Sequence, residues 1–458
     1  MIGTGLTSVT RLAHLVRERK LSPVEIAQET FAEIGRLEPE LQAWEALDEE
    51  RALNDARRAE DAVMRGELLG PLHGVPVGVK DIIATAGLRT TMGSPVFKDN
   101  VPAQDAAVVA RLRGAGAIIP GKTVSTQFAM GDPPRTRNPW DPRCTPGGSS
   151  SGSAVAVAAG ECPAALGTQT GGSVLRPAAY NGVTGFKPTY GLVSRRGVFP
   201  LSWSLDTVGW MCRTVTDAAV LLDVLSAHDS ADPASVTRER RPVAPQLVDR
   251  DRAAPRLGIV SGDYERTASV EMQAHMFEVI EFLRQGGNWV ELFDLPVSYV
   301  NIKDAQLVIN NVEAAAVHRK LFAERPDDYA AKARTAIECG ELVPAPAYVQ
   351  AQRLRRQFRS DMDEVMTAID ALIMPAAAGP APSDLSTTGD PAFYSPWTAA
   401  GMPAITIPTG ISRAGMPLGV QLVGKGFDDA GLLKAALWVE ERLNFTPVLP
   451  PLAEKLLP

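Results

Sequence analysis

Apolar and polar positions repeat with a helical period near the start of the chain. Ser22, Pro23 and Glu25 match the N-cap, the first and the third helical positions of a capping box. Apolar residues between 24 and 34 then recur with helical spacing, and charged residues fill the opposite face. We therefore expect residues 1–65 to form a helical arm packed on a larger body.

From Gly74 onward, short apolar runs alternate with helical patterns and glycine-rich turns. Residues 74–83 predict a strand that ends near Lys80, residues 105–116 predict a helix, and residues 117–124 predict another strand. This alternation of strands and helices is typical of an α/β layered body with a largely parallel sheet.

A polar, proline-containing stretch follows at residues 226–255, where no apolar period is visible. We expect a surface loop or linker there. The C-terminal half returns to ordered patterns, with strands and helices in turn. Strands are predicted at 256–262, 371–376, 404–411 and 417–424, and helices at about 268–285, 300–323, 346–369 and 428–443.

Length and composition set outer limits on the class of protein. The chain has 458 residues, of which 45% are hydrophobic and 22% charged, with a formal net charge of -7. These values are ordinary for a globular protein of two or three domains or of one large α/β domain. The acidic balance disfavours a role in gripping nucleic-acid phosphates. The four cysteines are scattered without a CxxC pair, which predicts reduced thiols.

The N-terminal segment does not have the order of a signal peptide, because Arg11, His14, Arg17 and Glu18 interrupt its apolar positions. No apolar stretch reaches the ~18 residues that a membrane-spanning helix needs. We therefore expect a soluble, cytoplasmic protein that does not bind a membrane.

Two local motifs favour other functions but lack the structural setting that those functions need. Gly116, Gly121, Lys122 and Thr123 fit the phosphate-loop pattern, yet the residues between the glycines are apolar and end in a proline, which favours a buried strand. Residues 148–152 fit G-x-S-x-G, with Ser150 as nucleophile. The turn sequence before them contains two prolines where the motif requires a strand, so we favour an accidental match.

A third arrangement joins two glycine-serine loops to a lysine. The loop at 147–152 leads into a helix of small residues, and the loop at 167–173 ends at Ser173. Two glycines in the second loop permit unusual dihedrals and exposed backbone N–H groups, so Ser173 would lie beside an oxyanion hole. Because no histidine lies nearby in the sequence, Lys80 at the end of its strand is the natural candidate for the base.

These residues are where the chain resembles the amidase signature family, the Ser–cis-Ser–Lys hydrolases. The family's loops appear as GGSSSG and GTQTGGS, with 24 residues (173 − 149) between the two key serines. Similar text continues over nearly the whole chain. The further matching blocks are residues 74–94, 181–211, 390–410 and 415–424.

The resemblance implies a fold and a set of boundaries. It implies one α/β domain over residues 1–458, with a large mixed sheet sandwiched between helices and an N-terminal helical arm. Within it, 74–225 would be the catalytic core, 226–255 a surface loop, and 256–458 the part that completes the sheet and the substrate pocket.

The resemblance also implies roles for individual residues. Ser173 would be the acyl nucleophile, Lys80 the base, and Ser149 the bridging serine, which follows a cis peptide bond from Gly148. Lysine is a base at neutral pH only if burial lowers its pKa from about 10.4. The oxyanion hole would be formed by the backbone N–H groups of Thr170, Gly171, Gly172 and Ser173.

One departure from the family text concerns charged residues beside the nucleophile. Gln169 stands where aspartate is commoner, and Leu175 stands at the arginine position, with Arg176 one residue later. Since acid and base are both absent, no charge is left without its partner. The substrate pocket is indicated less directly, and its expected residues are Met130, Gln169, Tyr394 and Trp397, although core packing is an equal interpretation of the aromatic pair.

The expected activity is hydrolysis of linear amides, at C–N bonds other than peptide bonds, without a metal or organic cofactor. The substrate would be a small-molecule amide, and no nucleic acid would bind. Esters or carbamates are an alternative, because the same acyl-enzyme chemistry serves them. The glutaminase (A) component of a tRNA-dependent amidotransferase is a second alternative, although the text of residues 390–403 is more similar to free-standing bacterial amidases. The sequence leaves monomer and homodimer open.

Overall fold

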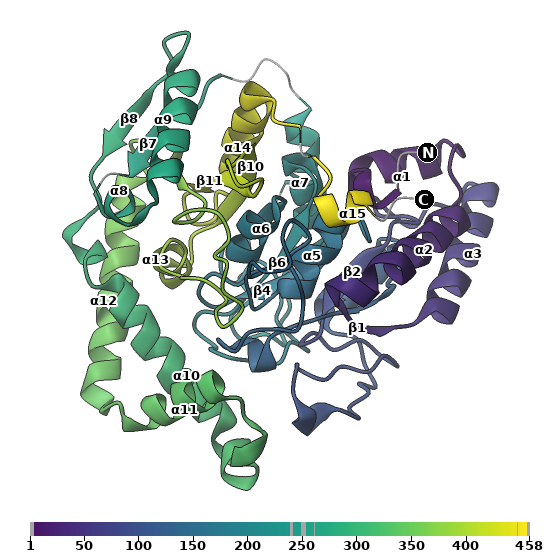
Figure 1. The fold of residues 1–458 in the computed structure, drawn as a ribbon, viewed down its shortest axis with the longest axis horizontal. Coiled ribbons are helices and arrows are strands. Elements are labelled where there is room, and N and C mark those ends of the chain that lie inside the picture. Colours follow the sequence, from purple (N-terminus) through teal and green to yellow (C-terminus); the bar gives the residue numbers. More distant parts are fainter. Residues whose placement is uncertain (1–3, 239–240, 249–252, 261, 447, 456–458) are drawn as a thin grey trace.

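A single mixed sheet crosses the molecule from end to end (Figure 1). The computed structural model describes residues 4–238, 241–248, 253–260, 262–446 and 448–455. Eleven strands within these ranges belong to the sheet. Their spatial order is β1 (Trp44–Leu47), β3 (Gly121–Thr123), β2 (Val77–Lys80), β4 (Ala164–Gln169), β6 (Thr207–Cys212), β5 (Thr184–Lys187), β10 (Ala404–Ile411), β11 (Pro417–Val423), β9 (Ala371–Pro375), β7 (Leu257–Val260) and β8 (Val290–Phe293).

Helices cover both faces of this sheet, as the alternation of side chains along β4 shows. Ala164 and Leu166 pack in the core that includes α7 (Val215–Leu225) and α14 (Asp429–Leu443), whereas Ala165 packs against α5 (Ser151–Ala159). Successive side chains of a strand point to opposite faces, so these cores lie on opposite sides. The predicted fold class, a large mixed sheet between helices, is confirmed.

The expectation of a largely parallel sheet is wrong. Parallel pairing is confined to β3–β2–β4 and to β9–β7–β8, and the central strands from β4 to β9 are antiparallel. A hairpin connection of only five residues, 412–416, joins β10 to β11 and permits no parallel pairing. The central strands are buried on both faces, so their sequences have the continuous apolar runs usually typical of parallel strands.

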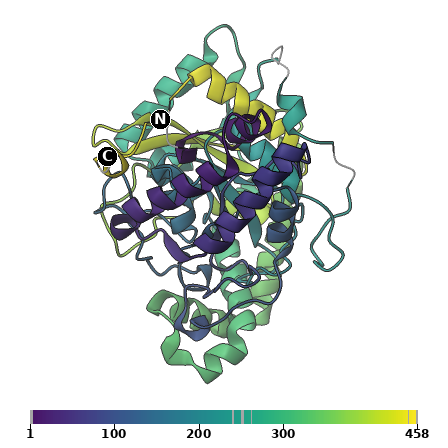
Figure 2. The same cartoon turned by 90° about the vertical axis from the view of Figure 1, so that its right-hand side faces the viewer.

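The N-terminal segment forms the expected helices together with one strand that the pattern did not show. Helices α1 (Val9–Arg17), α2 (Pro23–Leu41) and α3 (Glu49–Arg65) lie beside one another at one end of the sheet (Figures 1 and 2). The capping box at Ser22 and Glu25 is confirmed, with N···O distances of 3.1 and 3.3 Å. After α2, the carboxylate of Glu38 accepts the N–H groups of Ala43 and Trp44, and the chain turns into β1 at the sheet edge.

The remaining helices lie mainly in the C-terminal half, where α10, α11 and α12 form an extension below the sheet in Figure 1. The sequence pattern did not predict α11 or α13. No helix of the described ranges has the length and apolarity needed to traverse a bilayer. The α-helices not yet named are α4 (Ala107–Gly114), α6 (Leu175–Asn181), α8 (Asp263–Thr267), α9 (Val270–Arg284), α10 (Ile302–Glu324), α11 (Ala331–Leu342), α12 (Ala345–Val365), α13 (Ser395–Ala400) and α15 (Pro451–Lys455). Short 3-10 turns occur at Thr4–Leu6, Pro95–Phe97, Gln127–Ala129, Ala244–Leu247, Val297–Tyr299 and Pro326–Asp328.

Two glycines in helices provide a test of this packing. A Cβ at Gly152 of α5 would lie 2.2 Å from the Ala43 carbonyl oxygen, whereas a Cβ at Gly35 of α2 would meet nothing within 4 Å. Gly152→Ala should therefore destabilise the fold by about 1–3 kcal/mol. Gly35→Ala should stabilise it by up to ~1 kcal/mol through helix propensity. Urea unfolding of both variants measures the difference, and a Gly152→Ala protein as stable as the wild type would contradict the packing of α5 on β1.

Candidate active site

Lys80 lies at the carboxyl end of β2, between the parallel strands β3 and β4. Its side chain is fully buried. The Nζ atom lies 2.7 Å from Ser149 Oγ, 2.9 Å from Thr168 Oγ1 and 3.0 Å from Ser150 Oγ. All three partners are hydroxyls, so the amine contacts polar groups without a carboxylate to hold it as an ammonium ion.

The electrostatic setting of Lys80 follows from this burial. Removal from water penalises the charged form, which holds the pKa of Lys80 well below its ordinary value. The charge of nearby Asp206 acts in the opposite direction and is the smaller effect. An amine with such a pKa can exist uncharged near neutrality, and an uncharged amine can accept a proton.

The two predicted serines lie on adjoining loops. Ser149 follows a cis peptide bond from Gly148, as the resemblance implies, and its side chain contacts Lys80 directly. Ser173 keeps 8% exposure, and its carbonyl oxygen accepts the Ser150 N–H at 3.3 Å, which ties the two loops together. Among the described residues, no hydrogen bond joins the hydroxyls of Ser149 and Ser173. The structure thus brings Lys80 and Ser149 into contact and places Ser173 on the neighbouring loop.

The loop before Ser173 presents unused backbone donors. Within the part of the chain that the structure describes, the N–H groups of Gly171, Gly172 and Ser173 donate to no protein oxygen. Glycine is required at 172, because a Cβ there would lie 2.6 Å from the ring of Tyr394. A row of preorganised N–H groups can stabilise the negative oxygen that forms when a carbonyl is attacked.

The first residue of this loop is held from below by a buried carboxylate. Thr170 Oγ1 donates to Asp206 Oδ1 at 2.6 Å, and Asp206 Oδ2 accepts the N–H groups of Leu201 and Ser202 at 2.8 and 2.9 Å. Burial raises the pKa of Asp206, and these hydrogen bonds oppose that effect. Asp206 therefore fixes the Thr170 side chain and is not itself exposed to the cleft.

The departures from the family text have structural partners. The Gln169 side-chain oxygen accepts the N–H groups of Val174 and Leu175 at 2.9 and 3.0 Å, and its amide nitrogen donates to Thr398 Oγ1 at 3.0 Å. Arg176 donates to the Gly148 carbonyl at 2.7 Å, and also to the carbonyl of Gly389. Carbonyl and amide oxygens therefore perform here what a carboxylate–arginine pair could otherwise do.

The structure corrects the expected substrate pocket. Gln169 is fully buried and orders the nucleophile loop. The aromatic rings of Tyr394 and Trp397 are fully buried in a core cluster, and Trp397 stacks on Tyr299 at 6.0 Å between ring centroids. Met130 keeps only 7% exposure and also packs in the core. These side chains support the walls of the site and do not line an open pocket, because core packing was the stronger demand.

The two competing motifs take the positions that their sequence settings favoured. Lys122 lies in β3, fully buried, and its amine donates to the Ile83 carbonyl and to Thr85 Oγ1, so residues 116–123 do not form a phosphate loop. Ser150 is buried at the start of α5 with Lys80 and Thr168 as partners, and no strand directly precedes it. Sequence reasoning missed Ser150, Thr168 and Asp206 as neighbours of the site, because only the folded sheet brings them there.

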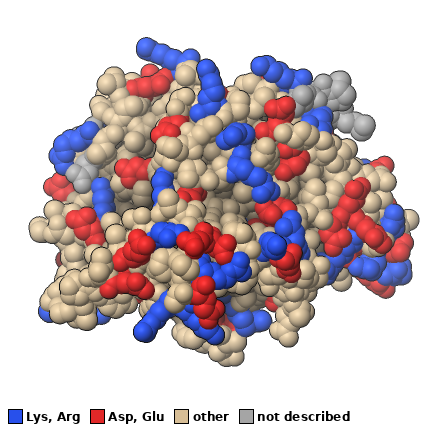
Figure 3. Space-filling model, turned by 60° about the horizontal axis from the view of Figure 1, so that its bottom comes forward, with Lys and Arg blue, Asp and Glu red and all other residues tan. Residues whose placement is uncertain are grey.

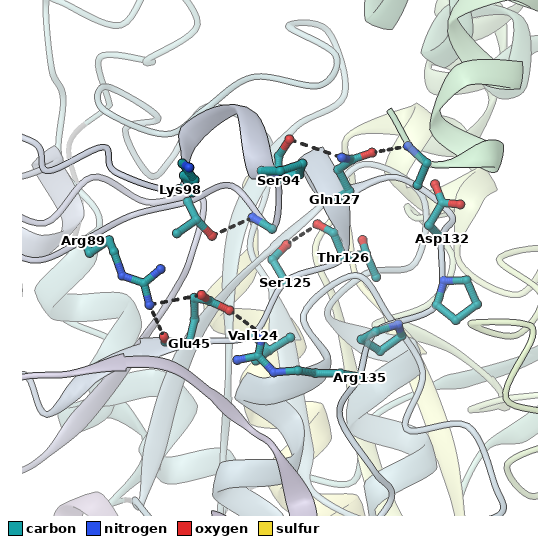
Figure 4. Close-up of a pocket in the computed structure, with 16 residues that line it drawn as sticks. Glu45, Arg89, Ser94, Lys98, Val124, Ser125, Thr126, Gln127, Asp132 and Arg135 are labelled. Atoms are coloured by element: carbon teal, nitrogen blue, oxygen red, sulfur yellow. Dashed lines mark hydrogen bonds and ion pairs between the residues drawn. The ribbon is translucent and has the colours of Figure 1, made fainter. Parts of the chain in front are cut away.

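A polar cavity of about 390 Å³ opens beside the catalytic cluster (Figure 4). Thr126, which lines it, donates its backbone N–H to the Ser149 carbonyl at 3.1 Å. Arg135 and Arg89 both pair with Glu45 in this cavity, at 2.7 and 3.3 Å. None of the three candidate catalytic side chains lines it, so the cavity adjoins the catalytic cluster without containing it.

Comparisons with known proteins agree with this geometry. The family described as Amidase matches residues 25–433. A putative amidase, AmiD, of Mycobacterium tuberculosis is 37% identical, with 93% of this chain and 92% of the relative covered. The glutaminase (A) component of the glutamyl-tRNA(Gln) amidotransferase of Carboxydothermus hydrogenoformans is 34% identical, with 97% and 99% covered.

Solved structures give the same result at the level of the fold. The peptide amidase of Stenotrophomonas maltophilia superposes with a TM-score of 0.86 at 31% identity, covering 97% of this chain and 98% of that one. A 6-aminohexanoate cyclic dimer hydrolase superposes with a TM-score of 0.86 at 26% identity, covering 98% and 99%. The sheet, the glycine-serine loops and these matches agree in one conclusion: the chain belongs to the amidase signature family of hydrolases.

Proposed function

We propose that the protein hydrolyses the C–N bond of small-molecule amides through an acyl-enzyme on Ser173, with Lys80 as base and Ser149 as proton relay. The observation that carries the proposal is the buried amine of Lys80 in contact with Ser149, on the loop next to Ser173. The unused N–H groups of residues 171–173 supply the electrostatic part of the reaction.

The hydrogen-bond inventory around Lys80 supports the direction of proton flow. A neutral amine has two N–H donors and one lone pair. Ser150 Oγ accepts the Thr168 N–H at 3.2 Å and donates to the Thr168 carbonyl at 3.3 Å, so it can only accept from Lys80. With the second N–H directed to Thr168 Oγ1, the lone pair is left for the hydroxyl of Ser149.

The reaction follows from this arrangement in two halves. Ser173 Oγ attacks the substrate carbonyl, its proton passes to Ser149, and the Ser149 proton passes to Lys80. The new C–O bond forms while the carbonyl oxygen becomes negative against the N–H groups. Return of the proton through Ser149 to the nitrogen allows the C–N bond to break, since an unprotonated amine is a poor leaving group. Water then attacks the acyl-enzyme by the same route and releases the carboxylate.

The choice of substrate class rests on weaker support than the chemistry. Esters and carbamates fit the same steps with easier leaving groups. The relatives include a putative amidase and the glutaminase component of an amidotransferase, and the text of residues 390–403 favours a free-standing enzyme. On the face shown in Figure 3, acidic and basic side chains are interspersed around a central hollow, which suits a small substrate better than a nucleic acid. We propose action without a partner chain, as a monomer or homodimer.

An assay of the purified chain alone separates these alternatives. A panel of linear amides, esters and carbamates with varied acyl groups should reveal amide turnover without added protein. Activity that appears only with glutamine and added partner chains would instead support the amidotransferase function.

Substitution of the nucleophile and the base tests the chemistry. Ser173→Ala should abolish turnover with the fold intact. Lys80→Ala should leave a small residual rate that rises with pH, because hydroxide then replaces the missing base. In the wild type, kcat/KM should fall as the pH drops through the lowered pKa of Lys80, since protonation removes the lone pair. Lys20→Ala, at an exposed position, is the matched control. Wild-type turnover in Lys80→Ala would remove the lysine from the mechanism.

A variant at Gln169 separates a structural from a substrate-binding role. Gln169→Ala leaves the N–H groups of Val174 and Leu175 without their partner, so turnover should fall by a similar factor for every acyl group in the panel. The variant should also unfold at a lower temperature, by about 1–3 kcal/mol of lost stability. A loss of rate confined to some acyl groups would show that Gln169 contacts substrate after all.

A further inference from the structure

The carbonyl groups of the nucleophile loop are each held by a separate donor. Gln306 Nε2 donates to the Thr170 carbonyl at 3.0 Å, and Thr398 Oγ1 donates to the Gly171 carbonyl at 2.8 Å. The N–H of Arg176 donates to the Gly172 carbonyl at 2.9 Å. Gln306 belongs to α10 and Thr398 to α13, so two of the three donors come from the C-terminal half of the chain.

The geometry of the peptide unit gives these contacts a consequence for the N–H groups. A peptide bond is planar and trans, so its C=O and the following N–H point in opposite directions. A donor that fixes the Thr170 carbonyl therefore fixes the direction of the Gly171 N–H. That N–H is one of the three groups without a protein partner in the described chain. Glycine at 171 has few steric restraints of its own, so an external hold determines its orientation.

Helix α10 contacts the supports of this loop at a second point. Seven residues after Gln306, about two helical turns, Glu313 accepts from Ser202 Oγ at 2.5 Å and from the Ser204 N–H at 2.9 Å. Ser202 in turn donates its N–H to Asp206, which holds the Thr170 hydroxyl. The same face of α10 thus holds Thr170 directly through its carbonyl and indirectly through its side chain.

We propose that Gln306 is a positioning residue of the acyl-transfer step: its amide holds the peptide between residues 170 and 171 so that the Gly171 N–H points at the oxyanion. Gln306 is 7% exposed, and a Cβ at Gly171 would lie 3.8 Å from its Nε2, so the amide borders the nucleophile loop. This inference rests on the proposed Ser173 acyl-enzyme, and Gln306 acts on the reaction only through the backbone.

The test uses Gln306→Met, which keeps the length of the side chain and removes the donor, and Gln306→Glu, which keeps the shape and removes the donor. An alkyl fluorophosphonate is the probe. Ser173 Oγ forms a bond to phosphorus, the P–F bond breaks, fluoride leaves, and the serine proton passes to Lys80. The phosphoryl oxygen occupies the oxyanion position, so the rate of labelling reports the N–H groups without a known substrate.

Both variants should be labelled more slowly by roughly 10- to 100-fold, a part of the loss seen when an oxyanion donor is removed outright. With any amide turned over in the panel, kcat should fall while KM stays within about twofold. The pH at which labelling is half-maximal should not move, because Lys80 and its hydroxyl partners are untouched. Lys320→Ala, at an exposed position on the same helix, should match the wild type in all three measurements.

Three results would overturn the inference. They are wild-type labelling rates in the variants, a raised KM with unchanged kcat, which would assign Gln306 to substrate binding, and a shifted pH midpoint, which would mean that the lysine cluster moved. Thermal unfolding checks the fold of both variants, and Gln306→Glu gives the same readout if Gln306→Met unfolds. Failure of the proposed function is distinct, since the wild type itself would then not be labelled at Ser173.

Discussion

The burial of one amine among hydroxyl groups is the constraint on which the site depends. Two other lysines are also fully buried, and burial lowers the pKa of Lys122 and of Lys187 to about 7. The Lys187 amine donates to the carbonyls of Pro188 and Met402, and carbonyl oxygens have no proton to give. The partners of Lys80 are hydroxyls, which can both accept and donate. Burial favours the neutral form of all three amines, and the hydroxyl partners alone make Lys80 suited to moving a proton.

The fold provides this environment by close packing of small residues. Strand β2 lies between two parallel strands, so the end of Lys80 has sheet on both sides. Helix α5 consists of small residues and valines, and a Cβ at Gly167 would lie 2.8 Å from Ser150 Oγ. The backbone of β4 can therefore approach the first loop closely enough for Thr168 to reach Lys80. The C-terminal half then holds the second loop through α10 and α13, which explains why the site needs nearly the whole chain.

The sequence predicted those parts of the site that lie on continuous motifs. The strand that ends at Lys80, the two glycine-serine loops and the mixed sheet were available from local pattern and resemblance. The antiparallel centre of the sheet was missed, because strands buried on both faces give the same apolar runs whichever way they pair. Gln306 and Thr398 were missed because they lie 136 and 227 residues from the carbonyls that they hold. Single polar residues in helical patterns carry no local signal of such a contact. Tyr394 and Trp397 were assigned to a pocket because aromatic residues in a loop fit either a pocket or a core.

The protonation state of Lys80 can be measured directly by NMR of protein labelled with ¹³C and ¹⁵N at lysine. The Lys80 resonances would be assigned by their absence in a Lys80→Met protein, with the corresponding variants at Lys122 and Lys187 to separate the other buried amines. The account predicts Cε and Nζ shifts of a neutral amine at pH 7, which change to those of an ammonium ion as the pH is lowered. Shifts of an ammonium ion that persist from pH 7 to ~10, near the ordinary lysine pKa, would contradict it.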